Sequence, residues 1–401
     1  MATRVLKFGG TSLATPARVQ AAARQVAAAH AAGDEIAVVV SAMGHTTDRL
    51  LDLAERVVRG SKSPRELDAL LATGEMVSAA LFAMALRSMG VAAESRAAAR
   101  TGLRTDCRHG NATILAVEAG GLDRALRDGR VPVVTGFQGV DDHGDLTTLG
   151  RGGSDTTAVA LAAALAALRH EPVACEILTD VRGVCTADPR IVTRARLIRR
   201  IDAAAMLQLA RAGAAVMHAE AIRLALRHGQ VLTVREAHPR RGRPLSGTII
   251  EPDPLPRDRP IAVATSTAWH RLRLDGDDSA VGGLISALAA RIDGSLAAAD
   301  GILIPESSIS AALEMTRAAA GELVGPLHIT HEPEVAVVSL VGGGELDSGE
   351  IEAPMGWWDG DPATAWWSMP ASAAVGFATR LHQAAGLTGS HAATATVARS
   401  T

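Results

Sequence analysis

Short apolar runs that end in a polar or glycine-rich turn and lead into a helical stretch recur along this chain, and this alternation constrains its fold most. Residues 3–8 form the first run, which Gly9-Gly10-Thr11-Ser12 and an alanine-rich helical stretch over 16–32 follow. Further apolar runs of the same kind occur at 35–40, 131–135 and 174–179. Strands that alternate with helices predict a mainly parallel sheet with both faces covered, an α/β sandwich.

Length and composition predict more than one domain. The chain has 401 residues, 48% of them hydrophobic, whereas a single domain typically has about 100 to 200 residues. A stretch rich in proline and arginine, 237–260, is predicted to be a linker. We expect the sandwich to occupy residues 1–250 and two small α+β modules to occupy 251–333 and 334–401.

The last module is less regular than the rest of the chain. Beyond an apolar run at 335–341, Trp357, Trp358, Trp366 and Trp367 are set among glycine, aspartate and proline. The tryptophans could form a binding surface. We favour a hydrophobic plug in a shortened module, or a subunit contact, because large aromatic side chains carry much apolar area.

Charge and cysteine content narrow the class of protein. A formal net charge of -3 with scattered basic residues gives no reason to expect nucleic acid. No apolar run approaches the ~18 uncharged residues of a membrane span, and the N-terminus lacks a signal-peptide pattern, so we expect a cytoplasmic protein without a membrane partner. Cys107, Cys175 and Cys185 form no CxxC pair, which predicts neither a disulfide framework nor a structural zinc site.

Lys7 is one of only two lysines in the sequence and stands at the end of the first predicted strand. Gly9 and Gly10 follow it, and glycines allow backbone N–H groups to approach a phosphate. Phosphoryl transfer requires mainly positioning and charge neutralisation, which a lysine beside such a turn can supply. An ordinary strand that ends in a glycine turn would give the same pattern.

The segment 147–157, TTLGRGGSDTT, is more specific. Three glycines lie among hydroxyl and carboxylate side chains, directly before an alanine-rich helix. Ser154 or Asp155 could simply cap that helix. Capping does not require Arg151, however, and an arginine in a glycine turn is suited to bind a carboxylate through two parallel hydrogen bonds.

Residues 179–190, TDVRGVCTADPR, follow another predicted strand and carry two aspartates and a Pro-Arg pair. Such a loop can hold ribose and phosphates while its carboxylates interact with a metal-bound nucleotide. The alternative is an ordinary Asx-rich turn before a proline.

Thr47 and Glu75 are two further candidates. Thr47, in the segment SAMGHTTD over 41–48, offers a hydroxyl to a substrate, although such turns are common. Glu75 lies in an otherwise apolar helical stretch over 63–88 and is either solvated or the acceptor of a substrate ammonium group.

Six motifs taken together resemble aspartokinases in order and spacing. They are KFGGTS at 7–12, SAMG-x-TTD at 41–48, GE-x-x-S at 74–78, GFQG at 136–139, TTLGRGGSDTTA at 147–158 and TD-x-x-GV-x-TADPRIV at 179–192. The resemblance covers residues 1 to about 235 and weakens beyond. It implies the amino-acid kinase fold, ATP with magnesium, and phosphorylation of the side-chain carboxylate of aspartate.

Carried over position by position, the resemblance implies three groups of residues. Lys7 and Asp155 would be catalytic, and no residue is expected to hold a resident metal. The amino acid would be held by Thr47, Glu75, Arg151, Gly152, Gly153 and Ser154. The nucleotide would be held by Gly9, Gly10, Ser12, Thr179, Asp180, Gly183, Asp188 and Arg190.

The sequence departs from the aspartokinase pattern in three places. Aspartokinases usually have tyrosine where this chain has Cys185, and their GAKVLHPR loop is GAAVMHAE here, with Ala215 in place of the lysine. Their paired C-terminal ACT modules, which bind an effector, would be degenerate here, so feedback inhibition by lysine or threonine is expected to be lost or altered. The resemblance also implies a homodimer formed through these modules.

Two other functions remain open from the sequence. The first is a kinase for a related amino or phosphonic acid, since Thr47, Glu75 and Arg151 would bind groups that amino acids share. The second is a catalytically silent homologue with a binding or regulatory role, which the departures at Cys185 and Ala215 motivate. The retention of Lys7 argues against a catalytically silent protein.

Overall fold

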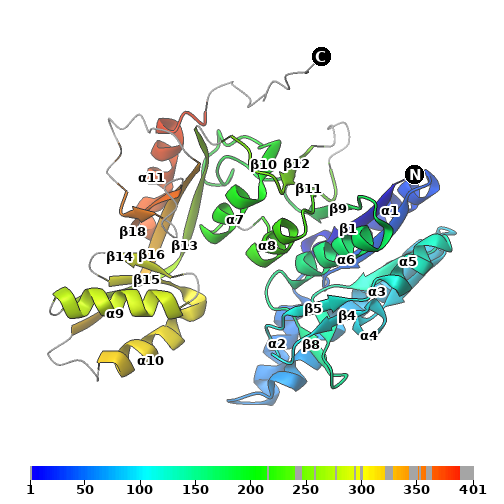
Figure 1. The fold of residues 1–401 in the computed structure, drawn as a ribbon, viewed down its shortest axis with the longest axis horizontal. Helices are drawn as coiled ribbons and strands as arrows, with labels where there is room; N and C mark the ends of the chain where they lie inside the picture. Colours follow the sequence, from blue (N-terminus) through cyan, green and yellow to red (C-terminus); the bar gives the residue numbers. More distant parts are fainter. Residues whose placement is uncertain are drawn as a thin grey trace. The chain divides into compact units, whose positions relative to one another are not determined.

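The structure, a computed structural model, describes residues 2–388 with several gaps and divides into two compact units (Figure 1). The first unit comprises residues 1–184, 197–207 and 215–255, and the second comprises 185–196, 208–214 and 256–401. The undescribed positions within these ranges are 1, 215, 240–245, 257–258, 276–277, 293–294, 299–300, 321–327, 343–350, 352–353, 358–363 and 389–401.

The first unit is built on an eight-stranded sheet in the order β10-β12-β11-β9-β1-β2-β6-β3. Its strands are β1 (Thr3–Phe8), β2 (Glu35–Val40), β3 (Ala93–Arg96), β6 (Val131–Thr135), β9 (Ala174–Thr179), β10 (Arg200–Asp202), β11 (Leu232–Glu236) and β12 (Gly247–Glu251). Only the β11–β12 pair is antiparallel, which confirms the mainly parallel sheet. The four apolar runs predicted as strands from sequence have the predicted bounds.

Helices α1, α3, α4, α5 and α6 contact this sheet, and the unit contains a second, smaller sheet. The helices are α1 (Pro16–Ala31), α2 (Thr46–Val57), α3 (Pro64–Ser88), α4 (Ala98–Thr101), α5 (Gly120–Arg127), α6 (Gly153–Arg169), α7 (Ala203–Arg211) and α8 (Ala219–Arg227), with a 3-10 turn at Thr11–Leu13. The second sheet has the order β5-β4-β7-β8, with β4 (Leu103–Thr105), β5 (Ile114–Val117), β7 (Gln138–Val140) and β8 (Leu146–Thr148).

Strand alternation decides which side chains of β1 face which helices. Leu6 and Phe8 point into the core with α1 and α3, where Phe8 and Phe82 pack with ring centroids 5.4 Å apart. Successive side chains of a strand face opposite sides of the sheet, so Lys7 points to the side that α6 covers. Helix α3 has the length and apolar composition of a membrane span, but its buried residues belong to the core of this unit.

The second unit contains a six-stranded antiparallel sheet in the order β14-β15-β13-β16-β18-β17. Its elements are β13 (Pro260–Asp275), α9 (Asp278–Arg291), β14 (Leu296–Ala298), β15 (Gly301–Pro305), a 3-10 turn (Glu306–Ser308), α10 (Ile309–Ala320), β16 (His328–Gly342), β17 (Gly356–Trp357), β18 (Thr364–Pro370) and α11 (Ala371–Ala384). Trp366 and Trp367 are buried, and Trp367 packs on Phe377 of α11. These two tryptophans are core residues, as favoured from sequence, whereas Trp358 lies outside the described residues.

Two elements of the structure bear on the domain boundaries expected from sequence. The predicted linker 237–260 contains β12, which pairs with β11 in the main sheet, so this stretch is not a simple linker. The predicted boundary between 333 and 334 falls inside β16, where Glu334 has a φ of 59°. The structure divides into two units, and the expected division into three domains stays a prediction.

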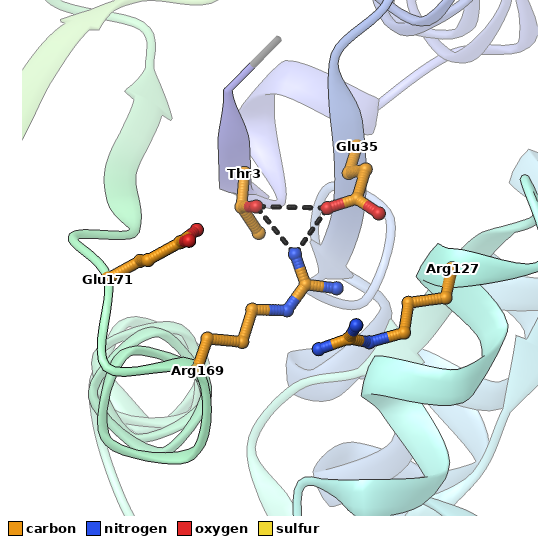
Figure 2. A pocket seen from close by; sticks show the side chains of 5 residues that line it. All are labelled: Thr3, Glu35, Arg127, Arg169 and Glu171. Carbon is orange, nitrogen blue, oxygen red and sulfur yellow. Dashed lines mark hydrogen bonds and ion pairs between the residues drawn. The ribbon is translucent and has the colours of Figure 1, made fainter.

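An ion-pair network anchors the C-terminal end of α6 at the starts of β1 and β2, beside a pocket of about 280 Å³ (Figure 2). Arg169 donates from Nη1 to Thr3 Oγ1 at 2.7 Å and pairs with Glu35 and with Asp123. Arg127 also lines the pocket. Because Arg169 is the last residue of α6, the network fixes the helix whose first turn carries Asp155.

Candidate active site

Lys7 and Asp155 form a buried ion pair where β1 ends and α6 begins. Lys7 Nζ lies 2.5 Å from Asp155 Oδ1, and about a tenth of each side chain is exposed (11% and 10%). The next residues continue the site, since a Cβ on Gly9 would lie 3.7 Å from Lys7 Nζ. The sequence separates the two charges by 148 positions, and the sheet brings them together.

The start of α6 differs from the capping expected from sequence. The N-cap is Gly152 with a φ of 73°, no side chain caps the helix, and Ser154 and Asp155 lie in the first turn. The proposed capping role of Ser154 or Asp155 is therefore wrong, and the Asp155 carboxylate pairs with Lys7 instead. A Cβ on Gly152 would lie 2.1 Å from the Cβ of His218, so the turn accepts only glycine at this position.

Glu75 is 3% exposed, which excludes the solvated alternative considered from sequence. Its Oε1 accepts a hydrogen bond from the Ala42 N–H at 2.8 Å, and its Oε2 has no hydrogen-bond partner in the described part of the chain. Burial raises the pKa of the Glu75 carboxyl to about 7, although the Ala42 N–H and the Lys7 charge pull it down. A buried acceptor with a free oxygen suits a substrate ammonium group.

Two segments carry other predicted amino-acid-binding residues, and the first of them contacts Glu75 through Ala42. Ala42 belongs to the segment after β2, where Thr47 is half-buried in the first turn of α2. In the glycine turn, Ser154 is buried against Gly136. Arg151 is exposed, and no described residue forms a hydrogen bond or ion pair with its side chain, which leaves its guanidinium available to a ligand.

The turn after β1 is tied to the end of β9. The Gly9 N–H donates to Leu178 O at 3.1 Å, and Ser12 Oγ donates to the same oxygen at 3.4 Å. A Cβ on Gly10 would lie 2.7 Å from Ala42 O, so close packing already explains this glycine. Gly9, Gly10 and Ser12, which are three of the residues predicted to hold nucleotide, thus lie together in the turn after Lys7.

The predicted nucleotide loop divides between the two units. Thr179 is the last residue of β9 and Asp180 follows it in the first unit, where Thr179 Oγ1 donates to Asp180 Oδ1 at 3.1 Å. Gly183 has a φ of 142° and packs on Thr248, so a side chain there would meet Thr248 Oγ1 at 2.7 Å.

Asp188 and Arg190 belong to the second unit. Arg190 Nη2 donates to Asp188 Oδ2 at 2.7 Å, and this hydrogen bond is the main reason that the pKa of Asp188 lies below its usual range. Thr186 between Cys185 and Asp188 bonds to His382 of α11 at 2.9 Å. The part of the loop that carries Asp188 is therefore anchored on the C-terminal helix.

Two residues of this region were not predicted from sequence. His218 packs on the glycine turn, as described above, and Asp68 of α3 is 1% exposed and accepts hydrogen bonds from three residues of other segments. The sequence gives no clear signal for Asp68, because it follows Arg65 and Glu66 near the start of α3, where acidic residues are common. Ala215, where the aspartokinase lysine is missing, lies outside the described residues.

A sequence model described as the amino acid kinase family matches residues 2–235. The chain belongs to the amino acid kinase family. Within the family it is similar to aspartokinases: one from Thermus thermophilus is 38% identical over 377 residues, which cover 88% of this chain and 89% of that protein. The resemblance to aspartokinases drawn from the motifs is confirmed.

Two further aspartokinases are similar to this chain. The aspartokinase of Bacillus sp. (strain MGA3) is 47% identical over 247 residues, which are 62% of this chain but only 58% of that relative's length. The crystal structure of E. coli aspartokinase III in complex with aspartate and ADP matches with a TM-score of 0.75 at 24% identity, covering 95% of this chain and 99% of that chain. This last likeness confirms the fold.

Proposed function

We propose that this protein is an aspartate kinase, which transfers the γ-phosphoryl group of ATP to the side-chain carboxylate of L-aspartate and forms 4-phospho-L-aspartate. The Lys7–Asp155 pair beside the buried Glu75 carries the proposal, because it joins a phosphoryl-neutralising cation to an ammonium acceptor in one site. The aspartokinase relatives, and the aspartate and ADP bound by the E. coli enzyme, support the choice of substrates.

The amino acid would bind between Glu75 and the glycine turn. Glu75 would accept the ammonium group with Oε2, and Arg151 would take the α-carboxylate through two hydrogen bonds. Thr47 and Ser154 would add hydroxyl contacts, and Gly152 and Gly153 would let the backbone approach. Opposite charges at two fixed positions select an α-amino acid over a simple carboxylate.

The nucleotide would bind along the turn after β1 and the loop after β9. The first-unit residues assigned from the resemblance would hold it, namely Gly9, Gly10, Ser12, Thr179, Asp180 and Gly183, whereas the nucleotide contacts of Asp188 and Arg190 in the second unit stay predictions. ATP would supply the phosphoryl group, and Mg²⁺ would arrive with the phosphates. That no residue of the chain holds a resident metal stays a prediction.

The transfer needs alignment and charge neutralisation. A side-chain carboxylate of the substrate is already ionised, so it attacks the γ-phosphorus without a general base, the new O–P bond forms, and the bond to ADP breaks. Lys7 would neutralise charge on the transferring group, and Asp155 would hold the ammonium of Lys7 in place.

A coupled assay of ADP release tests the proposal. We expect ADP release that depends on both aspartate and Mg-ATP in the wild-type protein and its loss in Lys7→Ala. Lys62→Ala is a matched control, because Lys62 is the other lysine and pairs with Glu55 on the surface. No turnover with aspartate would overturn the proposal, and turnover with another acid in a panel of amino and phosphonic acids would redirect it.

We also propose the assembly and setting that the family resemblance implies. The second unit would be a pair of degenerate ACT-like modules through which two chains form a cytoplasmic homodimer without normal lysine or threonine feedback. The α+β composition of this unit and its buried Trp366 and Trp367 support a folded module. Sedimentation of the full chain, and turnover with added lysine and threonine, test these points.

A further inference from the structure

Asp68 is a buried carboxylate that joins three segments of the first unit. It lies near the start of α3, and its side chain is 1% exposed. Its oxygens accept hydrogen bonds from Thr148 N at 3.0 Å and Thr148 Oγ1 at 2.5 Å, and from Gly110 N at 3.0 Å. His109 Nδ1 lies 3.0 Å from Asp68 Oδ2. One carboxylate therefore connects α3, the β4–β5 loop and β8.

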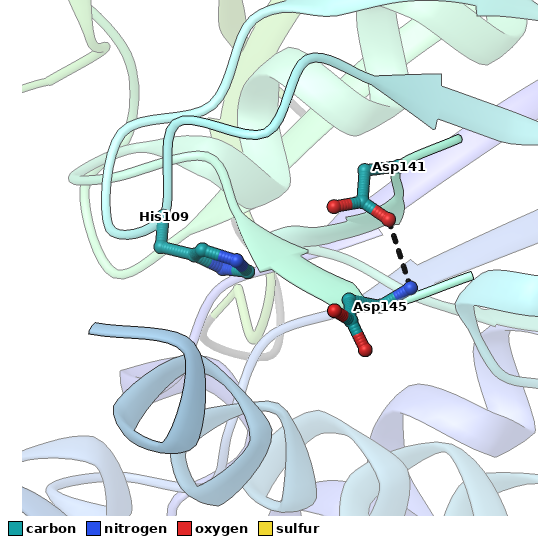
Figure 3. Close-up of side chains that lie close together, drawn as sticks. All are labelled: His109, Asp141 and Asp145. Carbon is teal, nitrogen blue, oxygen red and sulfur yellow. Dashed lines mark hydrogen bonds between the residues drawn. The ribbon is translucent and has the colours of Figure 1, made fainter. Parts of the chain in front are cut away.

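Two further carboxylates lie near His109. Figure 3 shows its ring beside Asp141 and Asp145 of the β7–β8 turn, and the candidate ligand atoms of the three residues lie within 4.8 Å of one another. Both carboxylates are already engaged, since Asp141 Oδ1 accepts the Asp145 N–H at 2.8 Å and Arg65 Nη2 donates to Asp145 at 2.5 Å. His109 Nδ1 is paired with Asp68 Oδ2, and this contact ties the loop with His109 to α3.

The segments that Asp68 joins lead directly to the proposed amino-acid site. Thr148 stands three positions before Arg151, and a Cβ on Gly150 would lie 2.7 Å from Asn111 Oδ1, so the β4–β5 loop packs on the glycine turn. Glu75 follows Asp68 by seven residues, about two turns of an α-helix, so both carboxylates lie on one face of α3. Asp68 therefore connects the helix of the ammonium acceptor to the turn of the carboxylate-binding arginine.

We propose that Asp68 is a positioning residue for the amino-acid substrate: through His109, Gly110 and Thr148 it holds the glycine turn with Arg151 at a fixed distance from Glu75. The substrate must meet both charges at once, and a small misplacement of either weakens binding and alignment. Charge-assisted hydrogen bonds to a buried carboxylate are strong enough to set this distance. The inference rests on the proposed function and names a residue that touches no substrate.

Steady-state kinetics of Asp68→Asn test the role. The amide keeps the shape but cannot accept all of these hydrogen bonds, so we expect the KM for aspartate to rise roughly ten- to hundredfold, while the KM for ATP changes less than about threefold. Thr148→Val, which removes one donor and keeps the size, should raise the KM for aspartate by about three- to tenfold and serves if Asp68→Asn does not fold.

Asp202→Asn is the matched control. Asp202 is also 1% exposed in the first unit, and its Oδ1 accepts the Ala205 N–H at 2.8 Å beside β10. This variant should lose thermal stability without raising the KM for aspartate. An unchanged KM in folded Asp68→Asn, or an equal rise in the KM values for both substrates, would overturn the positioning role.

Hydrogen exchange separates this inference from the proposed function. The Gly110 and Thr148 amides donate to Asp68, so they should exchange at least tenfold faster in Asp68→Asn than in the wild type. Unchanged exchange would show that Asp68 does not hold these segments. A wild-type protein without aspartate-dependent turnover would overturn the proposed function instead, and the exchange result would still decide whether Asp68 joins the three segments.

Discussion

Replacing Glu75 by glutamine should weaken substrate binding and stabilise the folded protein at the same time. Glutamine keeps the acceptor for the Ala42 N–H but removes the charge from Oε2, which has no described partner. Loss of a charge-assisted hydrogen bond to an ammonium group costs about 1.5–3 kcal/mol. We therefore expect the KM for aspartate at pH 8 to rise roughly ten- to hundredfold.

The stability change follows from the pKa of Glu75, which burial raises from 4.5 to about 7. Between these two pH values the unfolded chain loses a proton that the folded protein keeps, so the free energy of unfolding falls as the pH rises through this window. At pH 8 the wild type bears the whole cost, about 3 kcal/mol. Glutamine has no such cost, and after burial of its new amide the variant should gain about 1 kcal/mol or more at pH 8.

The pH dependence of catalysis gives a second measurement. With a pKa of about 7, Glu75 is about one tenth ionised at pH 6 and about nine tenths ionised at pH 8, so the wild-type KM for aspartate should fall about tenfold over this range. The Gln variant should lose this slope. Steady-state kinetics from pH 6 to 8 and urea unfolding at pH 5 and pH 8 measure both effects.

Glu176→Gln is a control in which the same substitution should have the opposite effect on stability. Glu176 is also buried, but Arg235 and Arg4 outweigh the effect of burial and lower its pKa, so its ionised form stabilises the fold at pH 8. Removing that charge should destabilise the protein. If Glu75→Gln behaves like Glu176→Gln and leaves the KM for aspartate unchanged, the assignment of Glu75 as an ammonium acceptor is refuted.

Two further substitutions test the start of α6. Asp155→Asn breaks the buried pair with Lys7 and should lower kcat at least tenfold, with a loss of about 3 kcal/mol or more in urea unfolding; unchanged kcat would remove Asp155 from the proposed site. Gly152→Ala should lower the free energy of unfolding by more than the ~1–2 kcal/mol of the backbone term, because its Cβ meets His218. Gly129→Ala measures the backbone cost alone, since Gly129 has a φ of 71° and no atom lies within 4 Å of a Cβ placed there. If both variants lose the same free energy of unfolding, the contact with His218 is contradicted.

Much of the first unit could be predicted from sequence because its signals are local. The apolar runs at 3–8 and 35–40 became β1 and β2 with the predicted bounds, since buried parallel strands are continuous apolar segments. The helical stretch expected over 63–88 became α3, which begins at Pro64 because proline fits the first turn of a helix. The order of the motifs was sufficient to predict the amino-acid kinase family.

Other features depended on contacts that no local pattern encodes. The run 247–251 lies between prolines and looked like linker, but pairing with β11 makes it a strand. Ser154 and Asp155 have the chemistry of helix caps, yet Gly152 takes the cap because its φ of 73° and the contact with His218 exclude a side chain there. In both cases a distant segment overrode the local preference.

The sequence by itself determined the α/β class and the family, because periodicity and motif spacing are properties of the chain. Only the tertiary structure decided where the side chains of Glu75 and Asp68 lie and which groups they contact. An acidic residue in an apolar helix can face water or the interior, and its burial, its partners and its pKa depend on segments such as Ala42 and Thr148 that fold against it. The same packing decided that Lys7, first noticed as a rare lysine, pairs with a carboxylate 148 positions away.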